Sequence, residues 1–416
     1  MSKNIVIIGG GIIGLCTAYY LQKEGHQVTV IDKSDFTTGA SYVNAGYITP
    51  SHFISLASPG IITQGIKWMF NASSPFYVKP RLDVDFLKWA WAFKKSANAK
   101  KVAASIPVIK DINLLSRDLY EEIKASNDFN FHFERKGLMM YYQSDKVGEH
   151  EWEVGKKALK IGLNVEHLTS KEAILKYEPN ADLNVKGAVY FDCDAHMTPS
   201  DFMPEMLGYL KSKGVQIVAN EKVKDIEVFN QIISKVITDK SAYSPDEVVM
   251  AAGSWSPLLT KKIGLKIPIQ AGKGYGINVE KQTNITVPSI LCEAKVAVTP
   301  MTGFTRFAGT MEIDRINHTI NPTRVNSIAT AAESFYNGLE IDQTEKDAAE
   351  CGLRPCSPDG LPYIGKSSKC SNLTIAAGHA MMGWSLGPAT GKLVTEIISN
   401  KKPSLDLQPF HPDRKF

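Results

Sequence analysis

The first 32 residues contain the feature that most restricts how this chain can fold, a glycine-rich turn placed between an apolar strand and a helix. The sequence predicts a strand over residues 5–8, a turn that reads Gly9-x-Gly11-x-x-Gly14, a helix over 15–23 and a second buried strand over 28–32. This order is one βαβ unit of a parallel sheet. The glycines of such a turn permit a sharp bend, let the backbone approach a pyrophosphate and let the helix pack on the strand.

An acidic residue stands where this kind of unit binds a ribose. Asp32 closes the second strand 18 residues after Gly14, where a carboxylate can accept hydrogen bonds from two ribose hydroxyls. We therefore predict a dinucleotide site made of Gly9, Gly11, Ile12, Ile13, Gly14, Asp32 and Lys33. NAD and FAD both bind to this unit, so the motif alone leaves both open. A glycine turn beside an incidental surface aspartate is the structural alternative.

Two later segments extend this site. The loop over residues 37–46 is rich in small residues, which suits a backbone that runs along a large cofactor toward a flavin ring, although a flexible connection has the same composition. Its predicted cofactor contacts are Gly39, Ala40, Ser41, Asn44, Ala45 and Gly46. An apolar strand from residue 247 ends in small residues at Gly253, as expected for a strand that runs up to a bound cofactor.

Taken together, these segments and several others resemble the D-amino acid oxidase superfamily of flavoproteins, and within it the D-amino acid dehydrogenase branch. The resemblance covers nearly the whole chain, and its carriers are residues 9–14, 39–41, 44–46, 50–53, 249–256, 352–362, 378–379 and 383–391. It implies an α/β plus α+β fold, with a Rossmann-like domain that binds FAD non-covalently and an antiparallel-sheet substrate domain. We expect the FAD domain to comprise residues 1–90, 152–262 and 345–416, and the substrate domain 91–151 and 263–344.

The resemblance also assigns a substrate-binding residue. Arg354 stands in a Leu-Arg-Pro segment whose arginine, in the glycine oxidase and D-amino acid oxidase relatives, binds the substrate carboxylate. A guanidinium suits this role because its planar fork binds a carboxylate through two hydrogen bonds and stays charged. The alternative is a structural arginine paired with Asp359 or with a backbone carbonyl.

Other site residues follow from the resemblance alone. Val223 matches a valine whose backbone meets the adenine, and Tyr275 matches a tyrosine that could meet the substrate or pack at the start of a strand. His52 matches a histidine typical of the branch, whereas for His196 we favour a structural role beside the helix predicted after it. The loop expected to line the flavin contains Gly378, His379, Met381, Met382, Gly383, Trp384 and Ser385, followed by a helix that starts near residue 388 and faces the flavin. Glycine oxidases have an arginine where this chain has Met381, so their specificity is not carried over.

The reaction implied is oxidation of a small D-amino acid, or of a D-imino acid such as a proline derivative, by hydride transfer to flavin N5, with electrons passed to a quinone or another acceptor that is not NAD. Catalytic contacts are assigned to Arg354, Tyr275 and His52. Three alternatives are kept: another flavin amine oxidase acting on sarcosine, glycine, a dipeptide or an N-alkyl amine, an NAD-dependent dehydrogenase, and a non-catalytic flavin-binding or assembly protein.

Composition limits the partners and the compartment. Forty-seven basic and 43 acidic side chains give a net charge of only +4, which is not the charge of a nucleic-acid-binding protein. The six cysteines form no C-x-x-C pair, so the sequence predicts neither a disulfide framework nor a metal site. Because no signal-peptide pattern and no run of about 18 apolar residues is present, we expect a cytoplasmic protein.

The segment between residues 60 and 100 differs in composition from the rest of the chain. Between residues 60 and 100 aromatic side chains alternate with basic ones, namely Trp68, Phe70, Phe76, Tyr77, Trp89, Trp91 and Phe93 with Lys67, Lys79, Arg81, Lys88, Lys94 and Lys95. We favour an aromatic core under a solvated basic face. The alternative is a surface that contacts the inner face of a membrane, with basic residues for anionic lipid.

Overall fold

The apolar run at the start of the chain forms β1 (Asn4–Ile8), which lies near the middle of a six-stranded sheet in the computed structural model of the chain. The structure describes residues 1–58, 60, 74–79 and 81–416. The sheet order is β10 (Gln216–Val218), β2 (Gln27–Ile31), β1, β14 (Glu247–Met250), β21 (Leu373–Ala377) and β20 (Tyr363–Lys366). All its neighbours are parallel except β20 and β21. Its apolar strands are buried on both faces, as in other parallel sheets.

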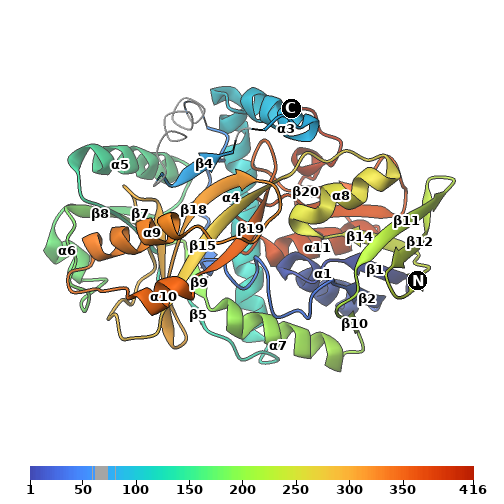
Figure 1. Cartoon of the computed structure of the whole chain (residues 1–416), viewed down its shortest axis with the longest axis horizontal. Helices are drawn as coiled ribbons and strands as arrows, with labels where there is room; N and C mark the ends of the chain where they lie inside the picture. The colour runs from blue at the N-terminus through green and yellow to red at the C-terminus, as the bar shows by residue number, and fades with distance from the viewer. Residues whose placement is uncertain (59, 61–73, 80) are drawn as a thin grey trace.

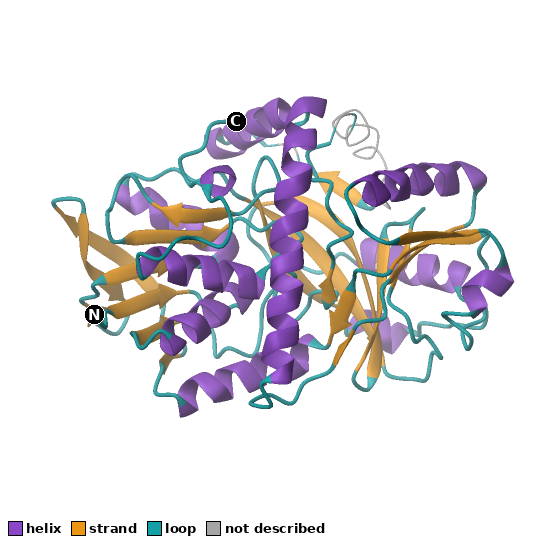
Figure 2. Ribbon diagram, turned by 180° about the vertical axis from the view of Figure 1, so that it is seen from behind, coloured by secondary structure: helices purple, strands orange, loops and turns teal. Residues whose placement is uncertain are grey.

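One face of this sheet is covered by helices. They are α1 (Ile12–Lys23), α4 (Ala99–Ala125), α7 (Pro199–Ser212) and α11 (Gly387–Ile398). Ile5 and Ile7 of β1 belong to the same buried cluster as Leu15 of α1, Tyr120 of α4 and Leu393 of α11. Figure 2 shows α4 as the long helix that runs down the middle of the molecule between its two lobes.

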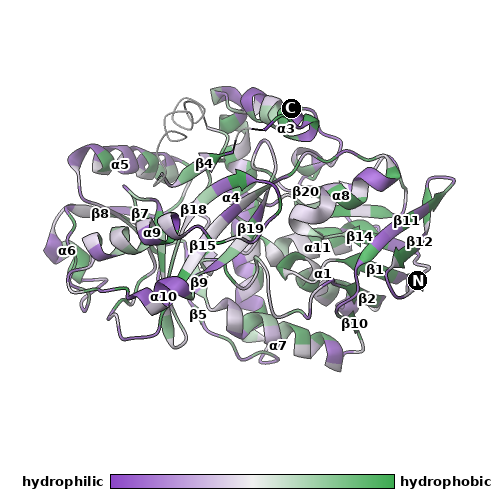
Figure 3. Ribbon diagram, in the orientation of Figure 1, coloured by the Kyte–Doolittle hydropathy of each residue, from purple (hydrophilic) through white to green (hydrophobic). Residues whose placement is uncertain are grey.

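The opposite face of the sheet is covered by a hairpin layer. It is a three-stranded antiparallel sheet of β11 (Val223–Phe229), β12 (Ile232–Thr238) and β13 (Ala242–Tyr243). Val6 and Ile8, which alternate with the helix-facing residues of β1, pack with Ile233 and Val236 of β12. The short helices η1 (Gly253–Trp255), α8 (Ser256–Thr260) and η2 (Lys261–Ile263) follow β14. In Figure 3 the central strands β1, β2 and β14 of the six-stranded sheet are coloured mainly as hydrophobic.

The second lobe is built on a nine-stranded mixed sheet (Figure 1). Its order is β19 (Glu350–Cys356), β15 (Gln270–Val279), β18 (Phe304–Asp314), β17 (Val296–Met301), β16 (Ser289–Leu291), β6 (Leu138–Tyr142), β8 (Gly187–Phe191) and β7 (Val165–Leu168), with β4 (Phe76–Val78) beside β18. Its helices are α3 (Val84–Ser96), α5 (Asp145–Lys160), α6 (Lys171–Leu175), α9 (Pro322–Phe335) and α10 (Gln343–Asp347). A separate core around Phe307 and Ile328 holds this lobe together.

The two lobes meet at a small sheet of β3 (Tyr47–Ile48), β9 (Ala195–Met197) and β5 (Phe133–Glu134). A last 3-10 helix, η3 (Gln408–Phe410), lies beside β20 near the end of the chain.

The expected fold class is confirmed, because a parallel dinucleotide-type sheet and a largely antiparallel sheet are both present. The domain division at the boundaries given above remains a proposal. Two of its segments contain elements that associate with the other lobe. Strands β7 and β8 fall within residues 152–262 of the predicted FAD domain, but they belong to the nine-stranded sheet of the second lobe, where β8 pairs with both β6 and β7. Helix α4 falls within residues 91–151 of the predicted substrate domain, but its apolar face packs on α11 in the core of the first lobe.

Candidate cofactor and substrate site

The glycine turn brings α1 directly against the sheet. Gly9 has a φ of +114°, and a Cβ there would lie 2.4 Å from the Ala251 carbonyl oxygen. A Cβ on Gly14 would lie 1.9 Å from the carbonyl oxygen of Gly9. Only glycine fits at these two positions, so the first turn of α1 begins at the carboxyl ends of β1 and β14. Backbone N–H groups at such a helix start bind phosphate.

Asp32 lies beside this turn in a fixed orientation. Its carboxylate accepts hydrogen bonds from the Gly10 N–H at 2.7 Å and from the Ser34 N–H and hydroxyl at 2.8 and 2.7 Å. Ser41 approaches from the next loop and accepts a hydrogen bond from the Ile12 N–H at 2.9 Å. The fold therefore brings together the glycine turn, the acidic residue and the small-residue loop, as the sequence predicts.

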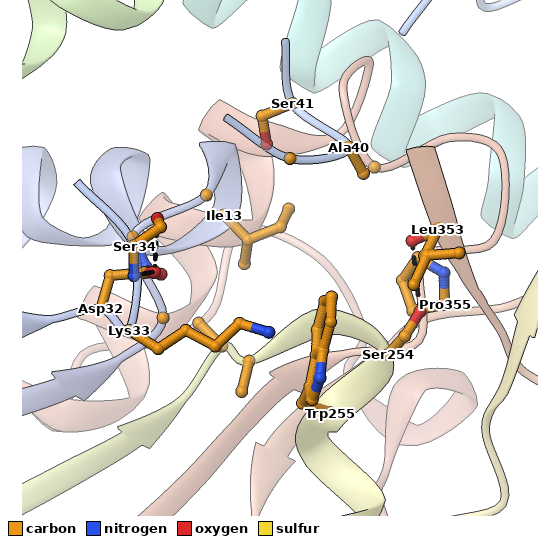
Figure 4. Close-up of a pocket in the computed structure, with 18 of the residues that line it drawn as sticks. Ile13, Asp32, Lys33, Ser34, Ala40, Ser41, Ser254, Trp255, Leu353 and Pro355 are labelled. Atoms are coloured by element: carbon orange, nitrogen blue, oxygen red, sulfur yellow. Dashed lines mark hydrogen bonds between the residues drawn. The ribbon is translucent and has the colours of Figure 1, made fainter. Parts of the chain in front are cut away.

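These groups line a cavity of about 940 Å³, a volume at the upper end of ligand sites, as an extended dinucleotide needs. The predicted residues that line it are Gly9, Gly11, Ile12, Ile13, Asp32, Lys33, Gly39, Ala40, Ser41, Asn44, Val223, Gly253, Arg354, His379, Met381, Gly383 and Trp384. Figure 4 shows part of it, with Asp32, Lys33 and Ser34 on one side and Leu353 and Pro355 on the other. The cavity thus joins the predicted adenosine end to the strand that carries Arg354.

Eight predicted residues do not line the cavity: Gly14, Ala45, Gly46, His52, Tyr275, Gly378, Met382 and Ser385. Gly14 lies beneath the turn, as its contact with Gly9 shows. The backbone of Gly46 is used by the small sheet, where its carbonyl accepts from the Met197 N–H at 2.9 Å. Ser385 donates to the Asn113 side-chain oxygen of α4 at 2.6 Å, and the Asn113 amide lies 3.7 Å from the Met382 sulfur.

Neither Tyr275 nor His52 reaches the cavity. Tyr275 is only 1% exposed, and its hydroxyl donates to Glu312 Oε2 at 3.1 Å inside the second lobe. The His52 ring lies 3.0 Å from the Ser51 hydroxyl, and burial lowers the pKa of His52 to about 4. Neither side chain is among the residues that line the cavity, and their contact with the substrate stays a prediction.

Arg354 occupies the other end of the cavity on β19. Its guanidinium lies over Gly274, where an added Cβ would be 1.9 Å from Nη1. Nη1 donates to the Thr310 carbonyl oxygen at 2.8 Å, and no carboxylate of the described residues lies within ion-pair distance of Arg354. Asp359 is instead bound by Arg414, through Nε at 2.7 Å and Nη2 at 2.8 Å. The alternative in which Arg354 pairs with Asp359 is therefore wrong. The other alternative partner, a backbone carbonyl, is present as the carbonyl of Thr310.

A strained residue supplies that carbonyl. Thr310 has a φ of +66° within β18, at a register shift opposite Gly274. A β-branched residue at positive φ is a genuine outlier, and such strain concentrates at functional sites. The strained backbone turns one carbonyl toward Arg354 and orients the guanidinium.

The loop after β21 closes the cavity near Arg354. The Ala380 N–H donates to the Pro355 carbonyl at 2.9 Å, which fixes this loop to β19. His379 is buried, its Nε2 lies 3.0 Å from the Thr390 hydroxyl, and burial lowers its pKa to about 3. Trp384 lines the cavity, and its buried indole N–H has no hydrogen-bond partner among the residues that the structure describes. An unused donor at a cavity wall fits a polar ligand.

Sequence reasoning missed several lining residues. Trp255 follows the predicted strand end, and the Lys33 ammonium lies 3.3 Å from its ring centroid, so these two side chains meet across the cavity (Figure 4). His318 stacks on Trp255 with ring centroids 6.1 Å apart. Glu221 and Lys222 lie next to Val223 and could have been proposed with it. His318 belongs to a loop after β18 with no local motif, so no sequence signal pointed to it.

The fold and the cavity define a two-lobed protein with a dinucleotide-type site and a partly buried guanidinium at the cavity wall. Residues 4–397 match the model of the DAO family, described as FAD dependent oxidoreductase, and the chain belongs to that family. FAD is its cofactor, which rules out the NAD alternative, and the residues of the turn, the ribose carboxylate and the cavity fit this group.

Relatives and solved structures agree with this assignment. The chain is 32% identical over 402 residues to a D-amino acid dehydrogenase of Helicobacter pylori (strain J99 / ATCC 700824), covering 95% of each chain. It is 29% identical to a D-amino acid dehydrogenase of Azorhizobium caulinodans, covering 97% of this chain and 98% of the relative. Glycine oxidase from Geobacillus kaustophilus has the same fold, with a TM-score of 0.78, 21% identity and coverage of 100% and 99%.

Proposed function

We propose that this enzyme oxidises the Cα–N bond of a small D-amino acid, or of a D-imino acid such as a proline derivative, and passes the electrons to an acceptor other than NAD. The observation that carries the proposal is Arg354, a partly buried guanidinium without a carboxylate partner among the described residues, at the end of a cavity of dinucleotide size. The names of the curated relatives support the substrate class.

Arg354 would hold the substrate carboxylate. A guanidinium has five N–H donors, and the described residues use one of them, for the Thr310 carbonyl. The remaining donors suffice for a two-bond clamp on a carboxylate. Because burial removes water from the guanidinium, which lowers the pKa of Arg354, an entering carboxylate would replace lost hydration.

Bound FAD supplies the redox chemistry, accepting a hydride from the substrate Cα–H. The chain supplies position and electrostatics. His379, which lines the cavity together with His318, is kept neutral by burial and is engaged with Thr390, so it is not placed as a base. Met381 lines the cavity and is 52% exposed, which leaves an apolar group where the glycine oxidases have an arginine. An apolar wall favours a substrate with a small aliphatic side chain over glycine.

The flavin would be bound without a covalent link. Cys351 lines the cavity, but its thiol donates to the His318 carbonyl at 3.4 Å. Burial raises the pKa of Cys351 and so keeps the thiol protonated, which makes it a poor nucleophile.

The electron acceptor would be a quinone or another carrier at a membrane surface. Helix α3 exposes a stripe of Val84, Leu87 and Trp91, and Trp91 is 58% exposed with the ammonium groups of Lys94 and Lys95 each 5.6 Å from its ring. Apolar side chains flanked by lysines suit the headgroup region of an anionic bilayer. None of the helices described here has the length and apolar character needed to cross a bilayer.

The aromatic-core interpretation of this segment also holds in part. Phe76, Trp89 and Phe93 are buried together, and the Trp89 indole donates to the Cys356 carbonyl at 2.8 Å. Trp68, Phe70 and Lys67 lie outside the described residues.

An anaerobic titration tests the proposal. The FAD-loaded protein is mixed with D- and L-amino acids, proline analogues, sarcosine and glycine, and flavin absorbance is followed before quinone or air is admitted. Bleaching by D-amino or D-imino acids, with fast reoxidation by quinone and slow reoxidation by air, is the expected result. Bleaching only by sarcosine, glycine or N-alkyl amines would assign the alternative flavin amine oxidase activity, and no bleaching by any amine would overturn both.

A further inference from the structure

Three side chains that can bind a metal meet outside the cavity, on the small sheet of β3, β9 and β5. They are His132, which immediately precedes β5, Glu134 of β5 and His196 of β9. One ligand atom from each residue lies within 4.8 Å of the other two. Two histidines and a carboxylate are a ligand set for Zn²⁺ and related divalent transition cations.

The backbone explains why these residues meet. Residues two apart in an extended segment point to the same side, which places His132 and Glu134 together. Glu134 and His196 are directly opposite each other in the antiparallel pairing of β5 and β9. Figure 1 shows the two strands side by side where the lobes meet.

Two of the three separations between the ligand atoms are close to those of a metal site. His132 Nε2 lies 3.7 Å and His196 Nε2 lies 3.6 Å from the same carboxylate oxygen, Glu134 Oε2. Metal–ligand bonds of about 2.1 Å in tetrahedral geometry put neighbouring ligand atoms roughly 3.4 Å apart. Small side-chain rotations therefore bring the three atoms onto one cation.

His196 gives independent evidence for a ligand. Its side chain is fully buried, and neither ring nitrogen has a hydrogen-bond partner among the residues that the structure describes. Buried polar groups nearly always have a partner, because an unpaired one keeps the cost of its lost hydration. The ring does not cap α7 either, since Thr198 is the N-cap residue of that helix. A bound cation would provide the missing partner.

His132 is held in the orientation that a ligand requires. Its Nδ1 lies 2.8 Å from the Thr198 hydroxyl, which also accepts a hydrogen bond from the Thr302 N–H at 2.9 Å. A hydrogen bond at one ring nitrogen leaves the other, Nε2, directed at Glu134. Metal-binding histidines commonly have such a partner on the nitrogen that does not touch the metal.

One competitor is present. The Lys136 ammonium lies 2.8 Å from Glu134 Oε2, the oxygen that the two histidines approach. The Lys136 side chain is 43% exposed, so it can turn into solvent when a cation binds.

We propose that His132, Glu134 and His196 bind a divalent transition-metal cation of the Zn²⁺ type. Such a cation joins β5 to β9, and β9 pairs with β3 directly after the cofactor loop that ends at Gly46. The cation therefore stabilises the junction between the lobes. The site departs from the sequence-based expectation of no metal, because 62 residues separate Glu134 from His196 and no metal-binding spacing is visible.

The test uses the FAD-loaded protein, stripped with a chelator and titrated with Zn²⁺ in a calorimeter. We expect one equivalent to bind and to raise the unfolding temperature. His132→Gln and Glu134→Gln should each weaken binding at least about tenfold, since even residues behind the ligands change affinity that much. Lys136→Ala should strengthen binding because it removes the competing cation.

His150→Gln is the matched control, because His150 is an exposed histidine outside the cluster. It should bind Zn²⁺ like the unmodified protein. The flavin spectrum, measured in chelator, shows whether each variant is folded independently of the metal. Absence of saturable one-equivalent binding, or binding that survives unchanged in both folded ligand variants, would overturn the proposal.

Discussion

Replacing Arg354 by methionine should remove most of the catalytic efficiency without unfolding the protein. The guanidinium shares one N–H with the Thr310 carbonyl and has no carboxylate partner among the described residues, so its other donors are open to the substrate. Truncating one partner of a buried, hydrogen-bonded charge pair costs about 2–5 kcal/mol, which corresponds to a loss of kcat/KM of roughly 30- to 5,000-fold. Arg354→Lys, which keeps the charge but not the fork, should recover part of this loss.

The same variant separates a substrate-binding role from a structural one. Arg354→Met removes a charge that has no counter-ion but also leaves the Thr310 carbonyl without its donor; because these two effects oppose each other, the unfolding temperature should change little. An amine that lacks the carboxylate should react slowly, and equally slowly with the unmodified protein and the variant. Arg135→Met, at an exposed arginine, is the control for general charge effects. An equal loss of activity toward the amine and the amino acid would refute the carboxylate role.

Three further predictions concern the fold and its surroundings. Gly14→Ala should abolish retention of FAD, because its Cβ would lie 1.9 Å from a backbone oxygen, whereas Gly208→Ala, with nothing within 4 Å, should retain FAD; flavin absorbance of the purified proteins decides this. Burial lowers the pKa of His379 to about 3 in the folded protein. As the pH falls from about 6.5 toward 3, this histidine is protonated in the unfolded chain but not in the folded one, so the free energy of unfolding decreases. His379→Gln should reduce this slope by up to about 1.4 kcal/mol per pH unit in urea unfolding between pH 4 and 6, and an unchanged slope would contradict the assignment; His150→Gln should leave it unchanged. Trp91→Ser should weaken sedimentation with anionic vesicles, and equal sedimentation would argue against α3 as the contact.

The sequence predicts the first lobe well because local rules determine it. Gly9, Gly14 and Asp32 act within one βαβ unit, and their roles follow from backbone geometry. Arg354 is predicted through the family resemblance of its Leu-Arg-Pro segment, and the structure adds what no segment reveals, namely that Asp359 pairs with Arg414.

The remaining features depend on contacts between distant residues. Tyr275 sits on a predicted strand, but which face of that strand meets the cavity depends on the register with β18 and its shift beside Thr310. Tertiary pairing also determines three other features. Strand β8, predicted in the FAD domain, pairs with β6 in the second lobe, His318 stacks on Trp255, and His132, Glu134 and His196 form a cluster. No periodicity or short motif encodes such pairings.

The central claim is that a carboxylate substrate binds on Arg354 inside the cofactor cavity. A crystal structure of the FAD complex, with a non-reactive carboxylate analogue of a small D-amino acid, tests it most directly. We predict both carboxylate oxygens within about 2.7–2.9 Å of Arg354 guanidinium nitrogens, the distance of a charge-assisted pair. A carboxylate bound elsewhere, with Arg354 left on the Thr310 carbonyl alone, would contradict the account.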